Sequence, residues 1–404
     1  MPRSLPRLAA AVAVALSIGA PLAAQTPAAR PDSAPDPVRA MVGRLDLEKY
    51  KATIKGLTKF GDRRQGTDRN RAAVDWIEAQ LRSYGCTPTA RITYDFQPPA
   101  PRAGAPASTA PRIPNSPPGG GRFRGKLDPT GVNTDSLAQP DATIRATDRQ
   151  PTAAGQRQEV YCTKVGTTHP DEMYIVGGHM DGIGWGEAAN DDGSGTALVM
   201  ELARVFSAPD VQTDRSIRFI LWNNEETGLN GAKAYVDQRQ ALQGKESPAG
   251  SGKYPEPRWL GMIQHDMMLF DHGMPNVDGT MPKQQRPEAD VNVEFQSASK
   301  QAPASQALAW AFANANEKYA TDYPATVGQH MTNTDSAPFQ DIIPAISLRE
   351  NERGAQIGAG WDPQWHQPTD LYSTYSDADF RLGLNAAQTT LGAVASLAGA
   401  RLAK

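Results

Sequence analysis

Apolar residues recur along this chain with two spacings, one typical of strands and the other of helices. Short apolar or alternating runs predict strands at 91–96, 159–165, 173–177, 216–222, 260–264, 291–295 and 342–348. Helical spacing predicts helices within 41–60 and at 70–84, 195–206, 229–240, 305–319 and 378–402. Several strands are apolar throughout and alternate with helices. This order predicts a three-layer α/β sandwich with a mixed, mainly parallel central sheet.

One long stretch, residues 97–156, departs from this pattern. It is rich in Pro, Ala, Gly and Ser, and its Pro117-Pro-Gly-Gly-Gly121 run suits neither a helix interior nor a central strand. We expect a partly disordered excursion that interrupts a single domain spanning 41–404.

The N-terminus has the pattern of an export signal. Arg3 and Arg7 precede an apolar run over residues 8–18, and small residues follow it. We expect a signal peptide at 1–24 with cleavage near Ala24, and a disordered leader at 25–40. A membrane anchor is the weaker alternative because the run is short for a bilayer span. The prediction is therefore a periplasmic or secreted protein with no stable membrane association after cleavage.

Composition narrows the possible partners. The formal net charge is −3 and no Lys/Arg cluster is present, which argues against a nucleic-acid binder. Cys86 and Cys162 are the two cysteines, and they form either a disulfide or two separate buried thiols. The sequence leaves the oligomeric state open.

Two polar motifs follow the apolar run that ends at Val176. His179 and Asp181 stand at this strand end, and Asp191 lies in Ala189-Asn-Asp-Asp-Gly-Ser-Gly195 before a helix. A carboxylate beside a histidine can hold one ring nitrogen and leave the other for a metal. Each motif also has a plain structural interpretation, as a surface pair or as a helix N-cap at Asp191 or Asp192.

Further candidate ligands follow later strands. Glu225 and Glu226 come after the strand at 216–222, Asp266 ends the strand at 260–264, and His366 lies in a late loop. We expect the neighbouring His265 to be a packed core residue that faces away from Asp266. Together, two histidines and three carboxylates suit two Zn²⁺ ions bridged by one carboxylate and a water. The oxygen-rich set is also compatible with Mn²⁺ or Co²⁺.

The order His-x-Asp, Asn-Asp-Asp-Gly-Ser-Gly, Glu-Glu-x-Gly, Asp, His resembles the secreted co-catalytic zinc peptidases typified by bacterial leucine aminopeptidases. Glutamate carboxypeptidases and glutaminyl cyclases are relatives of that family. The resemblance is loose over 46–84 and good from Val160 to the C-terminus. It implies an α/β sandwich and a di-zinc aminopeptidase that hydrolyses peptide substrates with a metal-bridged hydroxide.

The resemblance also implies individual roles. Glu225 is the expected general base. Asp181 is the expected second catalytic residue, and its carboxylate is expected to accept a hydrogen bond from a metal-bound histidine. Asp191 is the expected bridging carboxylate. The implied metal ligands are His179, Asp191, Glu226, Asp266 and His366.

Two positions depart from the family pattern. Trp365 stands where a tyrosine is common, and Ser336 stands where a histidine is usual in Asn333-Thr-Asp-Ser-Ala-Pro-Phe339. We expect Trp365 and Asp335 to contact substrate. A Trp-His pair also occurs in glutaminyl cyclases, so a single-zinc acyltransferase is the alternative, as is a carboxypeptidase or dipeptidase. A non-catalytic binding domain would lack ligands, and none of the five is missing here.

Overall fold

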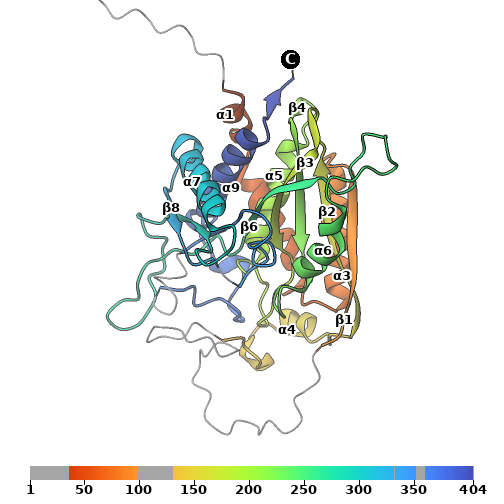
Figure 1. Cartoon of the computed structure of the whole chain (residues 1–404). Coiled ribbons are helices and arrows are strands. Elements are labelled where there is room, and N and C mark those ends of the chain that lie inside the picture. The colour runs from red at the N-terminus through yellow and green to blue at the C-terminus, as the bar shows by residue number, and fades with distance from the viewer. Residues whose placement is uncertain (1–35, 99–130, 332, 352–359, 404) are drawn as a thin grey trace, which may run out of the picture. The chain divides into compact units, whose positions relative to one another are not determined.

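The computed structural model describes residues 36–98, 131–331, 333–351 and 360–403, and an eight-stranded sheet forms its centre (Figure 1). In sheet order the strands are β1 (Thr89–Phe96), β2 (Gly155–Lys164), β5 (Arg215–Trp222), β3 (His169–His179), β6 (Arg258–His265), β9 (Ala345–Arg349), β7 (Val291–Phe295) and β8 (Ala325–Gly328). The predicted mixed, mainly parallel sheet is confirmed.

The four central strands run in the same direction. β5, β3, β6 and β9 pair in parallel, whereas β2 is antiparallel to β5 and β7 is antiparallel to β9. The carboxyl ends of these four strands therefore meet at one edge of the sheet. In α/β sheets this edge is the usual place for ligands.

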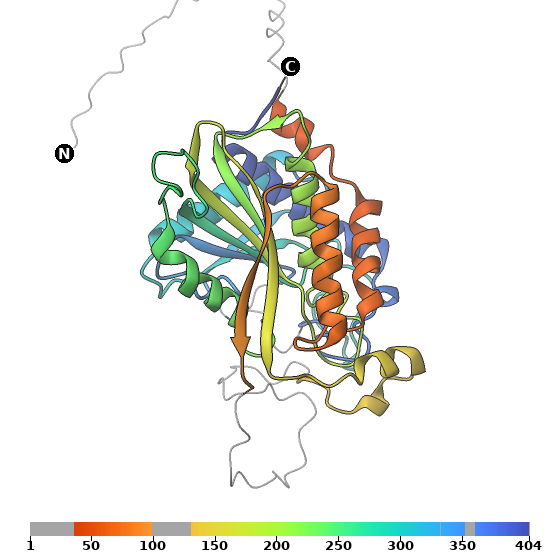
Figure 2. The same cartoon turned by 90° about the vertical axis from the view of Figure 1, so that its right-hand side faces the viewer.

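Helices cover both faces of the sheet. The helices are α1 (Pro37–Val42), α2 (Leu47–Leu57), α3 (Asp68–Ser83), α4 (Ala142–Asp148), α5 (Gly193–Phe206), α6 (Asn230–Arg239), α7 (Ala302–Tyr319) and α9 (Asp377–Leu397). Figure 2 shows the orange α3 and the green α6 on opposite sides of the sheet. This arrangement is the predicted three-layer sandwich.

Alternation along the strands separates two hydrophobic cores. Ile217, Phe219 and Leu221 of β5 belong to a core shared with α2, α3, α5, α7 and α9, whereas Ile220 and Trp222 belong to a core shared with α6. Successive side chains of a strand point to opposite faces, so both faces of β5 are buried. This explains why the central strands are apolar throughout.

Several boundaries differ from the predictions. Residues 1–35, which contain the expected signal peptide, lie outside the described residues. The last residues of the expected leader, 37–40, belong to α1. The strand expected at 342–348 begins only at Ala345, because Pro344 precedes it and residues 342–343 form a turn. The closing helix ends at Leu397, and the chain then forms a short strand, β10 (Arg401–Leu402), paired with β4 (Val211–Gln212).

The largest difference concerns the excursion. Residues 99–130 lie outside the described residues, but residues 131–154 contain a 3₁₀ turn (Ser136–Ala138) and α4. Asp141 caps α4 by accepting hydrogen bonds from the Thr143 and Ile144 amides. Part of the expected, partly disordered excursion is therefore ordered, and the sequence did not predict its helix α4.

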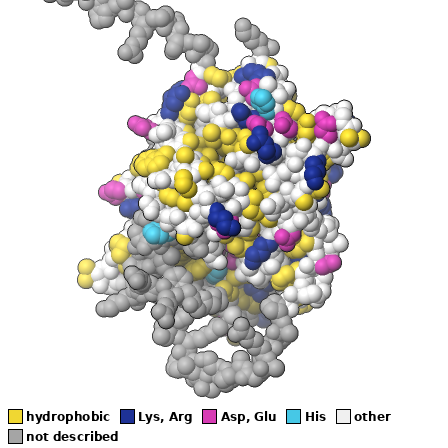
Figure 3. All heavy atoms as spheres, in the orientation of Figure 1, with side chains coloured by type: hydrophobic (Ala, Val, Ile, Leu, Met, Phe, Trp, Pro, Cys, Tyr) yellow, Lys and Arg dark blue, Asp and Glu magenta, His cyan; other side chains and the backbone are white. Residues whose placement is uncertain are grey.

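Cys86 and Cys162 form a disulfide that joins the end of α3 to β2. Within the described residues, no helix has the length and apolar character that crossing a membrane requires. On the face shown in Figure 3, Lys and Arg side chains are interspersed with Asp and Glu.

Candidate metal centre

The candidate ligands meet at the carboxyl edge of the sheet. His179 is the last residue of β3, Asp266 follows β6, and Glu226 lies four residues beyond the end of β5. Asp191 precedes α5, and His366 lies in the loop before α9. Because β5, β3 and β6 are parallel neighbours, their ends bring these residues together.

Asp191 lies between the two histidines. Its Oδ1 is 3.2 Å from Nε2 of His179, and its Oδ2 is 3.0 Å from Nε2 of His366. Nε2 of His179 also lies 3.8 Å from Asp266, and Nε2 of His366 lies 2.9 Å from Glu226. Two groups of three donors result, His179–Asp191–Asp266 and Asp191–Glu226–His366, and each could hold a metal ion.

The donor set fits zinc on two observations. Imidazole nitrogens and carboxylate oxygens are ordinary zinc ligands. The centre also buries a surplus of acidic groups, namely Asp181, Asp191, Asp192, Glu225, Asp266 and Asp335, close to two histidines and Arg349. Oε1 of Glu226 is buried and has no hydrogen-bond partner among the described residues. Buried carboxylates require compensating charge, and divalent cations would supply it.

The pKa values reflect this surplus. Burial alone would lower the pKa of His179, but Glu225, Asp192 and the other nearby carboxylates raise it well above the usual range. Likewise, Glu226 and Asp191 outweigh burial and raise the pKa of His366 to about 10. The environment therefore favours positive charge at both histidines.

Glu225 differs from its neighbour because it belongs to neither donor group among the described residues. Its amide donates to Oδ1 of Asp181 at 3.1 Å. Burial raises the pKa of Glu225 well above its usual range; His179 opposes this effect, and Asp335 and Glu226 add to it. A buried carboxylate with an elevated proton affinity can accept and return a proton.

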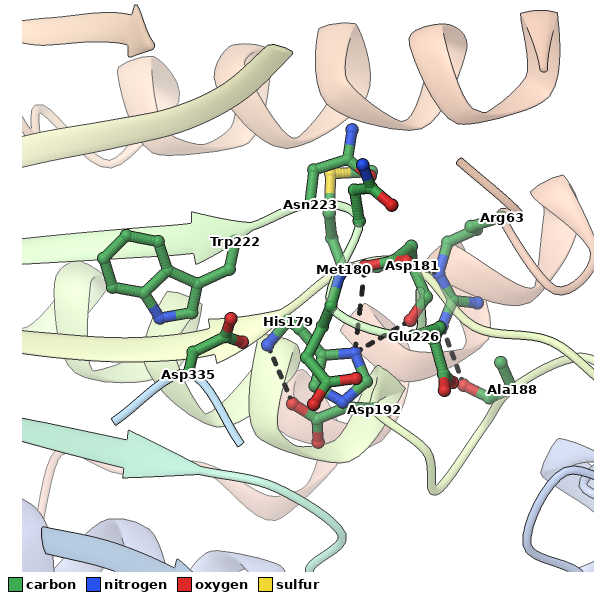
Figure 4. A network of polar contacts seen from close by, with 12 residues as sticks. Arg63, His179, Met180, Asp181, Ala188, Asp192, Trp222, Asn223, Glu226 and Asp335 are labelled. Carbon is green, nitrogen blue, oxygen red and sulfur yellow. Dashed lines mark hydrogen bonds and ion pairs between the residues drawn. The ribbon is translucent and has the colours of Figure 1, made fainter. Parts of the chain in front are cut away.

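Asp181 makes different contacts from those expected. Nδ1 of His179 donates to the backbone carbonyl of Asp181 at 2.9 Å, whereas the Asp181 carboxylate is 3.9 Å from this nitrogen (Figure 4). The backbone turns back after β3, so the carbonyl rather than the carboxylate fixes the ring. The carboxylate instead accepts the Glu225 amide, and its Oδ2 has no partner among the described residues.

Asp192, rather than Asp191, caps α5. Its Oδ1 accepts hydrogen bonds from the amides of Gly195 at 2.8 Å and Met267 at 3.2 Å. Its Oδ2 accepts from the amide of His179 at 3.0 Å. The N-cap alternative is thus met by Asp192, and Asp191 faces both histidines.

The remaining sequence candidates occupy the surroundings of the centre. His265 is hydrogen-bonded to the Gly177 carbonyl and to Thr390, so the prediction that it is a packed core residue is confirmed. Asp335 is buried, accepts from Gln264 at 3.4 Å, and has a pKa raised well above its usual range by burial. The Trp365 ring lies 4.2 Å, between centroids, from the ring of His366.

Sequence reasoning missed Arg63, which it treated as part of a turn. This buried guanidinium donates to the carbonyls of Gly61, Met180, Glu187 and Ala188 at 2.7–3.1 Å (Figure 4). The latter three carbonyls belong to the segment between His179 and Asp191. No motif could have identified Arg63, because all its partners are backbone atoms.

The chain is similar to known proteins. The model of Peptidase family M28 matches residues 159–389, more than half of the chain, and this range contains all five candidate ligands. The chain belongs to peptidase family M28. Among its relatives, it is 42% identical over 79 residues to "Aminopeptidase YwaD" of Bacillus subtilis (strain 168), covering 20% of this chain and 17% of that protein. It is 34% identical over 73 residues to "Carboxypeptidase Q" of Xenopus laevis, covering 18% and 16%. The aligned segments thus span less than a fifth of these relatives.

Solved structures share the fold. The aminopeptidase from Aneurinibacillus sp. strain AM-1 aligns with a TM-score of 0.56 and 22% identity, over 91% of this chain and 97% of that chain. The LapA aminopeptidase of Legionella pneumophila gives a TM-score of 0.58 and 17% identity, over 91% and 75%. Porphyromonas gingivalis glutaminyl cyclase gives 0.54 and 15%, over 88% and 99%. At these identities the likeness concerns the fold alone.

Proposed function

We propose that this M28 protein is a di-zinc aminopeptidase that removes N-terminal residues from peptides. The observation that carries the proposal is the position of Asp191, which offers one oxygen to each of two donor groups. Family membership supports peptide hydrolysis, and relatives named as aminopeptidases support the exopeptidase class.

Each residue has a role in this proposal. His179, Asp191 and Asp266 would hold one ion, and Asp191, Glu226 and His366 would hold the second. Zinc bound there would lower the pKa of a water molecule and polarise the scissile carbonyl. Glu225 accepts the proton of the attacking water and returns it to the leaving amine. Asp181 holds the backbone of Glu225, which keeps this carboxylate beside the metal ligands.

Trp365 and Asp335 are the proposed substrate contacts. The indole of Trp365 can donate one hydrogen bond but cannot act as an acid. Proton transfer is therefore assigned to Glu225 alone. Export is proposed as well, because the Cys86–Cys162 disulfide suits an oxidising compartment.

A chelator should abolish release of the arylamine from amino-acid arylamides, and Zn²⁺ should restore it.

Glu225→Gln should lower kcat by roughly 10²–10⁴-fold, the usual contribution of a general base. Its zinc content should stay at two equivalents, because Glu225 belongs to neither donor group. Glu317→Gln, at an exposed position of α7, is the control and should match the wild type. Full activity in chelator, or in Glu225→Gln, would refute the proposal.

A glutaminyl cyclase-like acyltransferase with one zinc is the second candidate, favoured by the packing of the Trp365 ring on His366. The two functions differ in product. A peptide with N-terminal glutamine should yield free glutamine from the aminopeptidase, whereas the cyclase would yield pyroglutamate. N-terminally blocked peptides test the carboxypeptidase alternative, since only a carboxypeptidase would shorten them from the other end.

A further inference from the structure

Residues 131–150, which belong to the segment between β1 and β2, lie against the loop that carries His366. The Asn133 amide donates to the His366 carbonyl at 3.0 Å. The Gln367 side chain donates to the Gly131 carbonyl at 2.7 Å. Backbone and side-chain hydrogen bonds thus join this segment to the ligand residue and to its neighbour.

Gln139 makes the most extensive of these connections. Its side chain is fully buried, and its Nε2 donates to the carbonyls of Trp185 at 2.7 Å and Pro368 at 2.9 Å. Its Oε1 accepts the Asp141 amide at 3.0 Å. Two carbonyls face the same nitrogen, so only a side chain with two donors satisfies both.

His366 needs support from its backbone more than His179 does. A metal-bound histidine usually gains its orientation from a hydrogen bond at its second ring nitrogen. Nδ1 of His179 has this bond, to the carbonyl of Asp181. Nδ1 of His366 is buried and has no hydrogen-bond partner among the described residues. Besides the packing of Trp365 on this ring, hydrogen bonds to the main chain of the His366 loop are therefore the contacts that can orient it.

The other end of the segment is attached to α3. Gln150 accepts the Arg69 amide at 3.1 Å and donates to Asp68 at 2.8 Å. Asp148 accepts from Arg69 at 3.3 Å and from the Asp62 amide at 3.2 Å. The segment thus connects a helix of the main body with the loop of His366.

We propose that residues 131–150 form a brace that positions His366 for metal binding, with Gln139 as the positioning residue. The inference rests on the proposed two-zinc site. The brace acts on the ion held by Asp191, Glu226 and His366. The other ion depends on His179 and Asp266. Gln139 also donates to the loop behind His179, at Trp185, but Arg63 holds that loop at Met180, Glu187 and Ala188.

The test measures zinc retained by purified protein after equilibration with increasing concentrations of chelator. Gln139→Met keeps the length of the side chain but removes its donors. We expect this variant to lose one equivalent at a chelator concentration about 10–100-fold lower than the wild type does, the usual cost of removing a group that orients a ligand. The second equivalent should leave at the wild-type concentration.

Gln156→Met is the matched control, because it changes the same residue type at an exposed position of β2, outside residues 131–150. It should retain both zinc ions as the wild type does. If Gln139→Met fails to fold, Gln367→Met removes the donor to Gly131 from the opposite side and should release the same single equivalent.

Two results would overturn the brace: equal zinc retention in Gln139→Met and wild type, or equal weakening in Gln139→Met and Gln156→Met. In both of these results the wild-type protein still binds two zinc ions. A wild type that binds no zinc would instead refute the proposed function, and the brace with it, so the two failures are distinguishable.

Discussion

Arg63 has an unusual environment for a buried charge. Its guanidinium contacts four backbone carbonyls, and the nearby carboxylates act on it only through space. The carbonyls of Met180 and Ala188 lie near the two ends of the segment that joins His179 to Asp191. The Arg63 side chain therefore fixes the distance between His179, a proposed ligand of one ion, and Asp191, the proposed bridging ligand.

Arg63→Lys tests this role. An ammonium group is a compact point charge and cannot reach carbonyls arranged around a planar fork. Each carbonyl left without a donor in a buried site costs roughly 1–3 kcal/mol. We expect zinc-free Arg63→Lys to lose about 3 kcal/mol of unfolding free energy in urea titrations, and the holoprotein to release zinc at lower chelator concentrations.

The neighbouring Arg64→Lys provides the control, because Arg64 is partly exposed and forms a longer 3.4 Å contact with Asp62. Its unfolding free energy should change by less than about 1 kcal/mol, as for other ion pairs that water reaches. Equal losses in the two variants would contradict the role assigned to Arg63.

At the scale of elements, one carboxylate joins the ends of two strands and a helix. Asp192 accepts amides from the end of β3, the start of α5 and the residue after Asp266. Alignment of β3 and β6 brings these amides into reach, and Asp192 then holds the three segments in register. His179, Asp191 and Asp266 each lie within one residue of an atom in this network.

Asp192→Ala should therefore cost more than the loss of an ordinary helix cap. A cap is worth about 1 kcal/mol, and each buried amide left unsatisfied adds roughly 1–3 kcal/mol. We expect a loss of about 3–5 kcal/mol in denaturant unfolding of the zinc-free protein. Asp141→Ala, which removes the exposed cap of α4, should cost only about 1 kcal/mol. Similar losses in the two variants would show that Asp192 acts as a cap alone.

The sequence predicted elements wherever burial imposes a regular pattern. The central strands and the helices at α3, α5, α7 and α9 have strong periodicity. His179, Asp191, Glu226 and Asp266 lie close to the ends of three of these strands or the start of α5, whereas His366 lies in a loop. α4 was not predicted because it is short and lies among residues 97–156, whose composition favours loops. Its position depends on contacts with distant residues such as Asp62 and Arg69, which no local pattern records.

Contacts made by backbone atoms were the least predictable part of the site. His179 is oriented by the carbonyl of Asp181, and Arg63 binds carbonyls only. Every residue has a carbonyl, so residue types cannot indicate which one lies within reach. The choice between Asp191 and Asp192 as the cap was likewise open, because both stand at a suitable distance from α5.

At the scale of the whole molecule, the disulfide keeps β1 and β2 together although a long segment of chain separates them. Cys86 and Cys162 are 76 residues apart, and the bond closes a loop that contains β1, residues 99–130 and the brace. β1 and β2 pair in register within this loop, with Thr89 opposite Cys162. The bond thus holds an edge of the sheet together across a long chain insertion.

Removing this bond should lower stability without altering the metal centre. Closing a loop of this length contributes roughly 4 kcal/mol in the chain-entropy treatment. We expect the double variant Cys86→Ala/Cys162→Ala to lose about that much unfolding free energy in urea, with two zinc equivalents and wild-type activity retained in native buffer. Both cysteines are buried, and neither is a candidate ligand: Cys86 follows α3, and Cys162 lies in β2. Wild-type protein unfolded in urea with a reductant is the control, since it loses the bond but keeps both thiols. A double variant as stable as the oxidised wild type would mean that the pairing of β1 with β2 holds this edge without the covalent bond.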